Sequence, residues 1–113
     1  MFEGFYTAYM SGPTGQSLAM FVFRDGIVAG ADVGGGIYSG SYAIDSVEQK
    51  VSLLVKFILP EESISIAGFE TEAEPIELEV PIELPIKIDP NAVFTIRTSL
   101  GSINSKFTKV RGF

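Results

Sequence analysis

The chain has 113 residues with eight basic and fourteen acidic side chains, a formal net charge of −6, and no histidine, cysteine or tryptophan. This length suits a single domain over residues 1–113, and the missing residues exclude disulfides, thiol nucleophiles, histidine-based triads and zinc sites with nitrogen or sulfur ligands. Net acidity also argues against binding to nucleic acid. We expect a protein that is not an enzyme and that has no cofactor and no metal.

The first residues lack the features of a targeting segment. Met1-Phe2-Glu3-Gly4-Phe5 carries no basic residue, whereas a signal peptide begins with a cationic region. No apolar stretch approaches the roughly 20 residues that a membrane-spanning helix needs. The absence of cysteine fits a reducing compartment. We therefore expect a cytoplasmic protein that does not associate with a membrane.

Two strands are predicted at the beginning of the chain. Alternating side chains place them near residues 4–10 and 17–23, on either side of the turn Gly12-Pro13-Thr14-Gly15. Arg24-Asp25-Gly26 then predicts a tight hairpin turn, because Asp-Gly readily adopts the positive φ angles that such turns require.

The following segment, 26–42, is rich in glycine. Its spacing matches neither the dinucleotide fingerprint nor the P-loop, and no helix is predicted after it. We interpret these glycines as places where the strands of a curved barrel bend or approach closely. Asp32 interrupts this otherwise apolar stretch. It is either a buried functional carboxylate or, as we favour, an acceptor for backbone N–H groups of the next turn.

Alternation of apolar and polar residues is clearest over 47–59 and 76–88. A period of two places one side of each segment in a core and the other in water, which is typical of strands. Pro81 and Pro85 cannot donate to a ladder, so we expect a true strand only over 76–80 and a poorly paired extended segment over 81–85. Residues 61–74 predict either a helical turn or another short strand.

Two further strands are predicted over 93–98 and 103–110, joined by a hairpin at Leu100-Gly101. Strands at near-regular spacing, with hairpin turns and no clear helix, predict an all-β fold. We expect a small antiparallel up-and-down β-barrel of the lipocalin type, with about eight strands and at most one short helical turn. Short turns link the successive strands, and closure of the barrel removes exposed strand edges.

Acidic and basic residues are segregated along the chain. Eight glutamates lie between residues 61 and 83 without a basic residue, whereas the residues after Asp89 include four basic and no acidic ones: Arg97, Lys106, Lys109 and Arg111. The acidic stretch predicts a docking surface for a basic protein. An alternative that needs fewer assumptions is pairing across strands between the acidic and the basic stretch.

Aromatic residues recur on the expected strands. In so small a barrel they usually fill the interior, and the alternative is that they line a pocket for a small apolar ligand. The candidates are Phe5, Tyr6, Tyr9, Phe21, Phe23, Tyr38, Tyr42, Phe57, Phe69, Phe94 and Phe107.

The order of motifs in the first part of the chain resembles the GrlR-type family of negative regulators of type III secretion, which have a lipocalin-like barrel. The resemblance lies in Gly4-Phe5-Tyr6, in Asp25-Gly26 followed by Gly30-Ala31-Asp32, and in Tyr38-Ser39-Gly40-Ser41-Tyr42. The closing hairpin through Phe107 fits the family more loosely. The motif residues, structural or binding, are Gly4, Tyr6, Asp25, Gly26, Gly30, Asp32, Tyr38, Gly40 and Tyr42.

This resemblance implies a homodimeric barrel, either empty or accommodating a lipid, that acts by binding another protein such as a transcriptional activator. The family's regulator carries an acidic run in the turn after the Tyr-x-Gly-x-Tyr strand. The candidate partner-binding residues are Asp45 and Glu48 in the corresponding turn, together with Glu77, Glu79 and Glu83. We expect a non-enzymatic regulatory protein that binds a basic protein; the alternative is a lipocalin-like carrier of a small apolar ligand.

Overall fold

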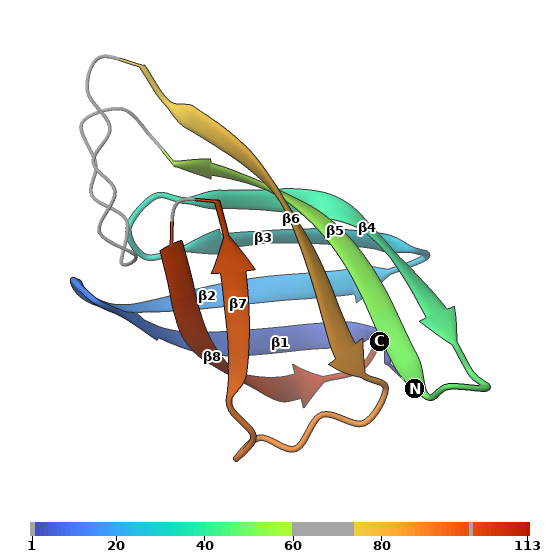
Figure 1. Cartoon of the computed structure of the whole chain (residues 1–113). Helices are drawn as coiled ribbons and strands as arrows, with labels where there is room; N and C mark the ends of the chain where they lie inside the picture. Colours follow the sequence, from blue (N-terminus) through green and yellow to red (C-terminus); the bar gives the residue numbers. More distant parts are fainter. Residues whose placement is uncertain (1, 60–73, 100) are drawn as a thin grey trace.

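The computed structural model describes residues 2–59, 74–99 and 101–113, and eight antiparallel strands form its regular structure (Figure 1). They are β1 (Gly4–Gly12), β2 (Gly15–Arg24), β3 (Ile27–Asp32), β4 (Ile37–Asp45), β5 (Lys50–Leu59), β6 (Ile76–Pro85), β7 (Phe94–Thr98) and β8 (Gly101–Arg111). Their order in the sheet is β6-β5-β4-β3-β2-β1-β8-β7.

The sheet curls into a nearly closed barrel, which confirms the predicted all-β fold class. Strands that follow one another along the chain are paired, except β6 and β7, and β1 also pairs with β8 from Phe5↔Arg111 to Ser11↔Asn104. Among the described residues no ladder joins β6 to β7, so these two strands are the edges of the sheet. None of the described residues forms a helix.

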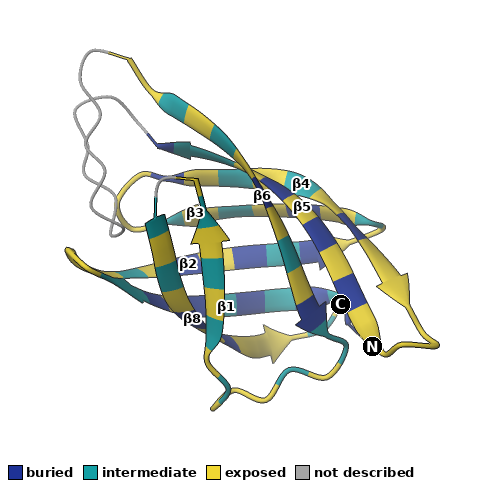
Figure 2. Ribbon diagram, viewed as in Figure 1, coloured by how far each residue is buried: buried dark blue, intermediate teal, exposed yellow. Residues whose placement is uncertain are grey.

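Alternation along the strands separates an inner face from an outer face, as the sequence predicts. On β5, Val51, Leu53 and Val55 are buried, whereas Lys50 and Lys56 are exposed. Figure 2 shows the same alternation on β1 and β2, where buried residues alternate with intermediate or exposed ones. Burying each such aliphatic side chain contributes about 1.5–3 kcal/mol, so the inner face supplies most of the stability of the barrel.

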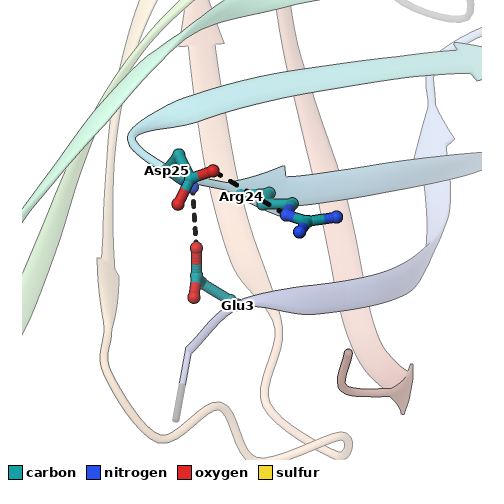
Figure 3. Close-up of polar contacts among 3 residues, drawn as sticks. All are labelled: Glu3, Arg24 and Asp25. Atoms are coloured by element: carbon teal, nitrogen blue, oxygen red, sulfur yellow. Dashed lines mark hydrogen bonds and ion pairs between the residues drawn. The ribbon is translucent and has the colours of Figure 1, made fainter.

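The predicted hairpin turn at Asp25-Gly26 is confirmed. The two residues have φ angles of 51° and 77°, and Arg24 pairs with Ile27 across them. Positive φ at both central residues gives the turn whose twist matches that of the flanking strands. The backbone N–H of Asp25 donates to a carboxylate oxygen of Glu3 at 2.7 Å, and the Arg24 guanidinium lies 3.7 Å from the Asp25 carboxylate (Figure 3).

The expectation of a poorly paired segment over 81–85 is wrong. β6 is one continuous strand, and its register with β5 extends from Leu59↔Ile76 to Lys50↔Pro85. The reason is that Pro81 and Pro85 stand an even number of residues apart, so both missing N–H groups fall on the same edge of the strand. With that edge turned away from β5, the ladder between β5 and β6 loses no donor.

Two other expectations concern where a strand begins and a segment that lies almost entirely outside the described residues. The strand predicted from residue 47 begins at Lys50, because residues 46–49 form the turn after β4. The helical turn or strand expected over 61–74 lies outside the described residues, apart from Glu74. Within the described ranges no helix is long and apolar enough to cross a membrane.

Phe2 closes one end of the barrel. The centroid of its ring lies 4.9 Å from that of Phe23 and 5.5 Å from that of Tyr42, and the Tyr6 hydroxyl donates to the Phe2 carbonyl oxygen at 2.5 Å. All four side chains are buried. Aromatic pairs in edge-to-face or tilted contact add about 0.5–1.5 kcal/mol beyond their burial. We call Phe2, Tyr6, Phe23 and Tyr42 the aromatic end of the barrel.

Candidate ligand-binding site

The interior of the barrel contains a cavity of about 290 Å³. All eight strands contribute to its wall, and most of the lining side chains are aliphatic or aromatic. This volume stands at the lower limit of the range of about 300–1,000 Å³ that is typical of ligand pockets. The aromatic residues in the lining are Phe21, Phe23, Tyr38, Phe57 and Phe107.

The cavity extends from Phe23 toward the end of the barrel that lies opposite the aromatic end. Because the strands are antiparallel, the turns after β1, β3 and β7 lie at the same end. Gln16, Asp32 and Thr98 stand at or beside these turns and belong to the cavity lining. We call this the cavity end. The interpretation that aromatic residues fill the interior therefore holds at the aromatic end and is wrong at the cavity end.

Asp32 is held in place by three hydrogen bonds at the end of β3. One carboxylate oxygen, Oδ1, accepts from the backbone N–H groups of Gly34 at 2.9 Å and Gly36 at 2.8 Å. The other, Oδ2, accepts from the Tyr38 hydroxyl at 2.7 Å. The favoured interpretation of Asp32, an acceptor for the following turn, describes this arrangement. The sequence did not indicate the contact with Tyr38.

Tyr38 presents a protonated hydroxyl to Asp32. Burial raises the pKa of Tyr38 far above its ordinary value, and the hydrogen bond from its hydroxyl to Asp32 and the negative charge of that carboxylate raise it further. The ring of Tyr38 lies 4.8 Å from that of Phe57 and 5.0 Å from that of Phe21, measured between centroids. These contacts fix the direction of the hydroxyl, so the Asp32–Tyr38 pair is a well-defined polar feature in a mostly apolar wall.

Two of the motif glycines permit close approach of neighbouring strands. A side chain at Gly40 would overlap the carbonyl of Leu54 on β5, and one at Gly30 would lie 2.6 Å from the ring of Phe21 on β2. Both glycines therefore let the barrel wall curve tightly, in agreement with the structural interpretation of the segment 26–42.

The motif residues divide between the two ends of the barrel. Tyr42 donates its backbone N–H to the Gly26 carbonyl at 2.9 Å, which ties the second motif to the third. Gly30, Asp32 and Tyr38 stand in or beside the cavity wall. Those at or near the aromatic end are Gly4, Tyr6, Asp25, Gly26 and Tyr42.

The acidic candidates for partner binding lie outside the cavity. Asp45 accepts from the backbone N–H groups of Val47 at 3.0 Å and Glu48 at 3.1 Å, so its carboxylate stabilises the turn after β4. Glu77, Glu79 and Glu83 lie on the exposed face of β6. The structure therefore does not gather these five residues into one site.

The alternative of pairing between the acidic and the basic stretch does not hold for Glu77 and Glu83. Glu77 pairs with Lys56 at 3.1 Å and Glu83 with Lys50 at 3.2 Å, both lysines belonging to β5. The cause is the order of the strands, because β6 lies next to β5, whereas β8 lies between β1 and β7. The glutamates of β6 therefore meet lysines that precede them in the chain.

Phe2 is the structural residue that sequence reasoning missed. It precedes the first strand and belongs to no alternating segment, so periodicity gives no signal for it. Its burial and its contacts with Tyr6, Phe23 and Tyr42 determine which end of the barrel is closed. An aromatic residue just before a strand that starts with glycine is the one hint the sequence offers.

Comparison with known proteins identifies no family for this chain. No family model matches the chain, and no curated protein matches it. The resemblance to the GrlR-type family therefore stays a prediction from motifs.

Proposed function

We propose that this barrel binds a small, largely apolar molecule in its cavity. The observation that carries the proposal is the cavity of about 290 Å³, walled by all eight strands and lined mostly by apolar side chains. Transfer of apolar surface from water into such a wall favours binding by about 25 cal/mol per Å². The cysteine-free sequence favours the cytoplasm as the place where this binding occurs.

A cavity of this size limits the ligand. It stands near the lower limit of ligand pockets, so the bound molecule is a short acyl or alkyl compound or a single small ring system. The Asp32–Tyr38 pair and the hydroxyl of Ser17 lie in the lining, and they can orient a polar group at the cavity end. An apolar body with one polar end fits this arrangement.

The test is a titration with an uncharged fluorescent probe, N-phenyl-1-naphthylamine, followed by displacement with 1-decanol. We expect saturable binding at one site per chain, and loss of binding in Val55→Phe, because Val55 lines the cavity and the larger ring fills it. Leu54→Phe is the matched control, since Leu54 immediately precedes Val55 on β5 and its side chain is 48 % exposed on the outer face. Absence of binding by the wild type, or equal loss in both variants, refutes the proposal.

A second candidate function is regulation by protein contact, as the GrlR-type resemblance implies. The observation that favours it is the outer face of β1 to β4. Its outward positions between residues 5 and 43 hold no Asp, Glu, Lys or Arg apart from the turn-flanking Arg24, and they expose Leu18, Met20, Ile27 and Ile37. Exposed apolar surface of this kind is typical of protein contacts. Basic proteins such as a transcriptional activator remain proposed partners through the acidic face of β6.

We propose a second copy of the same chain as the occupant of this outer face. Two chains with a net charge of −6 each repel one another, and they approach most easily through a face with few charges. Sedimentation analysis tests this: the wild type should be a dimer, Met20→Glu a monomer, and Ser52→Glu, on the outer face of β5, a dimer still. A monomeric wild type contradicts it.

A further inference from the structure

We infer that the cavity selects neutral and cationic amphiphiles and rejects anionic ones of the fatty-acid type. This inference rests on the proposed binding function and names the class of ligand. Its basis is that Asp32 is the one charged side chain among the described residues that line the cavity.

Polar groups in the lining gather at the cavity end, where a ligand's head group would lie. Ser17 is near the start of β2, Asp32 ends β3 and Thr98 ends β7, so all three lie at the same end of the barrel. Deeper in the cavity the wall consists of side chains such as Leu53, Val80 and Ile82. An amphiphile therefore binds with its apolar tail inward and its head group near Asp32.

The Asp32 carboxylate can accept one more hydrogen bond. A carboxylate offers about four lone-pair positions, and the backbone N–H groups of Gly34 and Gly36 and the hydroxyl of Tyr38 occupy three of them. The same three bonds hold the carboxylate in place before any ligand arrives, which lowers the entropic cost of binding. A head group that donates a hydrogen bond, such as an ammonium or an alcohol, satisfies this acceptor.

No cation lies in the cavity wall to neutralise an anionic head group. The chain has eight lysine and arginine residues; all eight belong to the described residues, all are exposed, and none lines the cavity. They are Arg24, Lys50, Lys56, Lys87, Arg97, Lys106, Lys109 and Arg111. A ligand carboxylate at the cavity end would therefore face Asp32 without compensation, and like charges brought close out of water repel strongly.

The experiment compares three ligands with the same alkyl chain: decylamine, 1-decanol and decanoate, each displacing N-phenyl-1-naphthylamine near neutral pH. By analogy with lysine and glutamate side chains, the amine is positive and the carboxylate negative under these conditions. We expect decylamine to bind about tenfold or more tightly than decanoate, with 1-decanol between them, and the difference to shrink as salt increases. Equal affinities, or tightest binding of decanoate, overturn the inference but leave the proposed function intact. If no ligand displaces the probe and the probe itself does not bind, the proposed function fails as well.

The variant that isolates the charge is Asp32→Asn. Asparagine keeps an oxygen acceptor for Gly34 and Gly36 but carries no charge, so the preference for decylamine over decanoate should fall to within about twofold. Asp45→Asn is the matched control, because Asp45 makes the same kind of bonds to a turn but does not line the cavity. An unchanged preference in Asp32→Asn overturns the inference.

A second variant covers the case in which Asp32→Asn fails to fold. Val33→Lys places a cation at the cavity end, where Val33 lines the cavity and is 77 % exposed. This change leaves the three hydrogen bonds of Asp32 in place and should tighten decanoate binding about tenfold relative to decylamine. If the ratio of the two affinities does not move in Val33→Lys, head-group charge does not govern binding and the inference is wrong.

Discussion

The two ends of the barrel are formed by the same eight strands but are filled in different ways. At the aromatic end the ring of Phe2 lies within the barrel, with its centroid 4.9 Å from that of Phe23 and 5.6 Å from that of Tyr6. At the cavity end the rings of Tyr38 and Phe57 lie 4.8 Å apart, but both line the wall of a cavity of about 290 Å³.

This difference shows which residues fill the interior of a small barrel. Side chains on the strands form the wall at both ends, and closure at the aromatic end depends on a residue that precedes β1. The wall side chains alone leave a cavity. The pattern of the strands therefore determines the wall, and single residues outside the strands determine whether it is filled.

The largest expected effect is loss of stability when the closing residue is removed. Phe2→Ala should lower the free energy of unfolding by about 3–5 kcal/mol, because it removes a ring that is 2 % exposed and leaves a void. Phe57→Ala should cost less than half as much, since its ring is only partly buried and borders a cavity already present. Urea unfolding followed by circular dichroism measures both, and equal losses would show that the two ends are packed equally well.

The turns at the two ends provide the next comparison. Asp32→Ala should lower the free energy of unfolding by about 1.5–3 kcal/mol, because a partly buried carboxylate loses three hydrogen bonds. Asp45→Ala removes two exposed bonds at the turn after β4 and should cost about 1 kcal/mol or less. Chemical denaturation of both variants checks the order, and a greater loss from Asp45→Ala would contradict it.

Enlarging one buried side chain at each end tests whether the cavity has room for an added ring, because overpacking lowers the free energy of unfolding. Val51 and Val55 both point inward from β5 and are buried, but only Val55 lines the cavity. Val51→Phe should cost about 1–3 kcal/mol through overpacking, whereas Val55→Phe should change stability by less than about 1 kcal/mol because the ring has space. Thermal and urea unfolding give both values. Similar losses would mean that the cavity cannot accept the added ring.

The smallest effect concerns alkaline pH. Burial raises the pKa values of Tyr38 and of Tyr6 above the usual value, so above pH ~10 the unfolded chain releases protons that the folded chain retains. Stability is therefore fully present below that pH and decreases as pH rises above it. Tyr38→Phe should make this decrease less steep. Urea unfolding at several pH values measures how the free energy of unfolding depends on pH. Identical slopes in the wild type and in Tyr38→Phe would contradict the raised pKa of Tyr38 in the folded protein.

The sequence predicted the strands well because alternation is a local signal. Residues 47–59 and 76–88 place apolar side chains on one parity, and the structure buries or partly buries that parity on β5 and β6. Asp25-Gly26 predicted its turn for the same reason, since the φ angles depend on two neighbouring residues. The turn-binding role of Asp32 was likewise readable from the glycines that surround it.

What could not be predicted depends on which strands become neighbours. Pairing of the glutamates with the basic stretch after Asp89 was one of two interpretations, but β6 lies beside β5, so Glu77 and Glu83 meet Lys56 and Lys50. The cavity is a property of the same kind. Its volume depends on how side chains from opposite walls meet, and no local pattern contains that information.

The two prolines of β6 have a consequence for the behaviour of the chain at high concentration. An open strand edge is a template on which another extended chain can add itself, and repeated addition leads to fibrils. Pro81 and Pro85 interrupt the row of amide donors along β6, so an incoming chain finds no continuous partner there. The β6 edge of the sheet is therefore a poor template for aggregation.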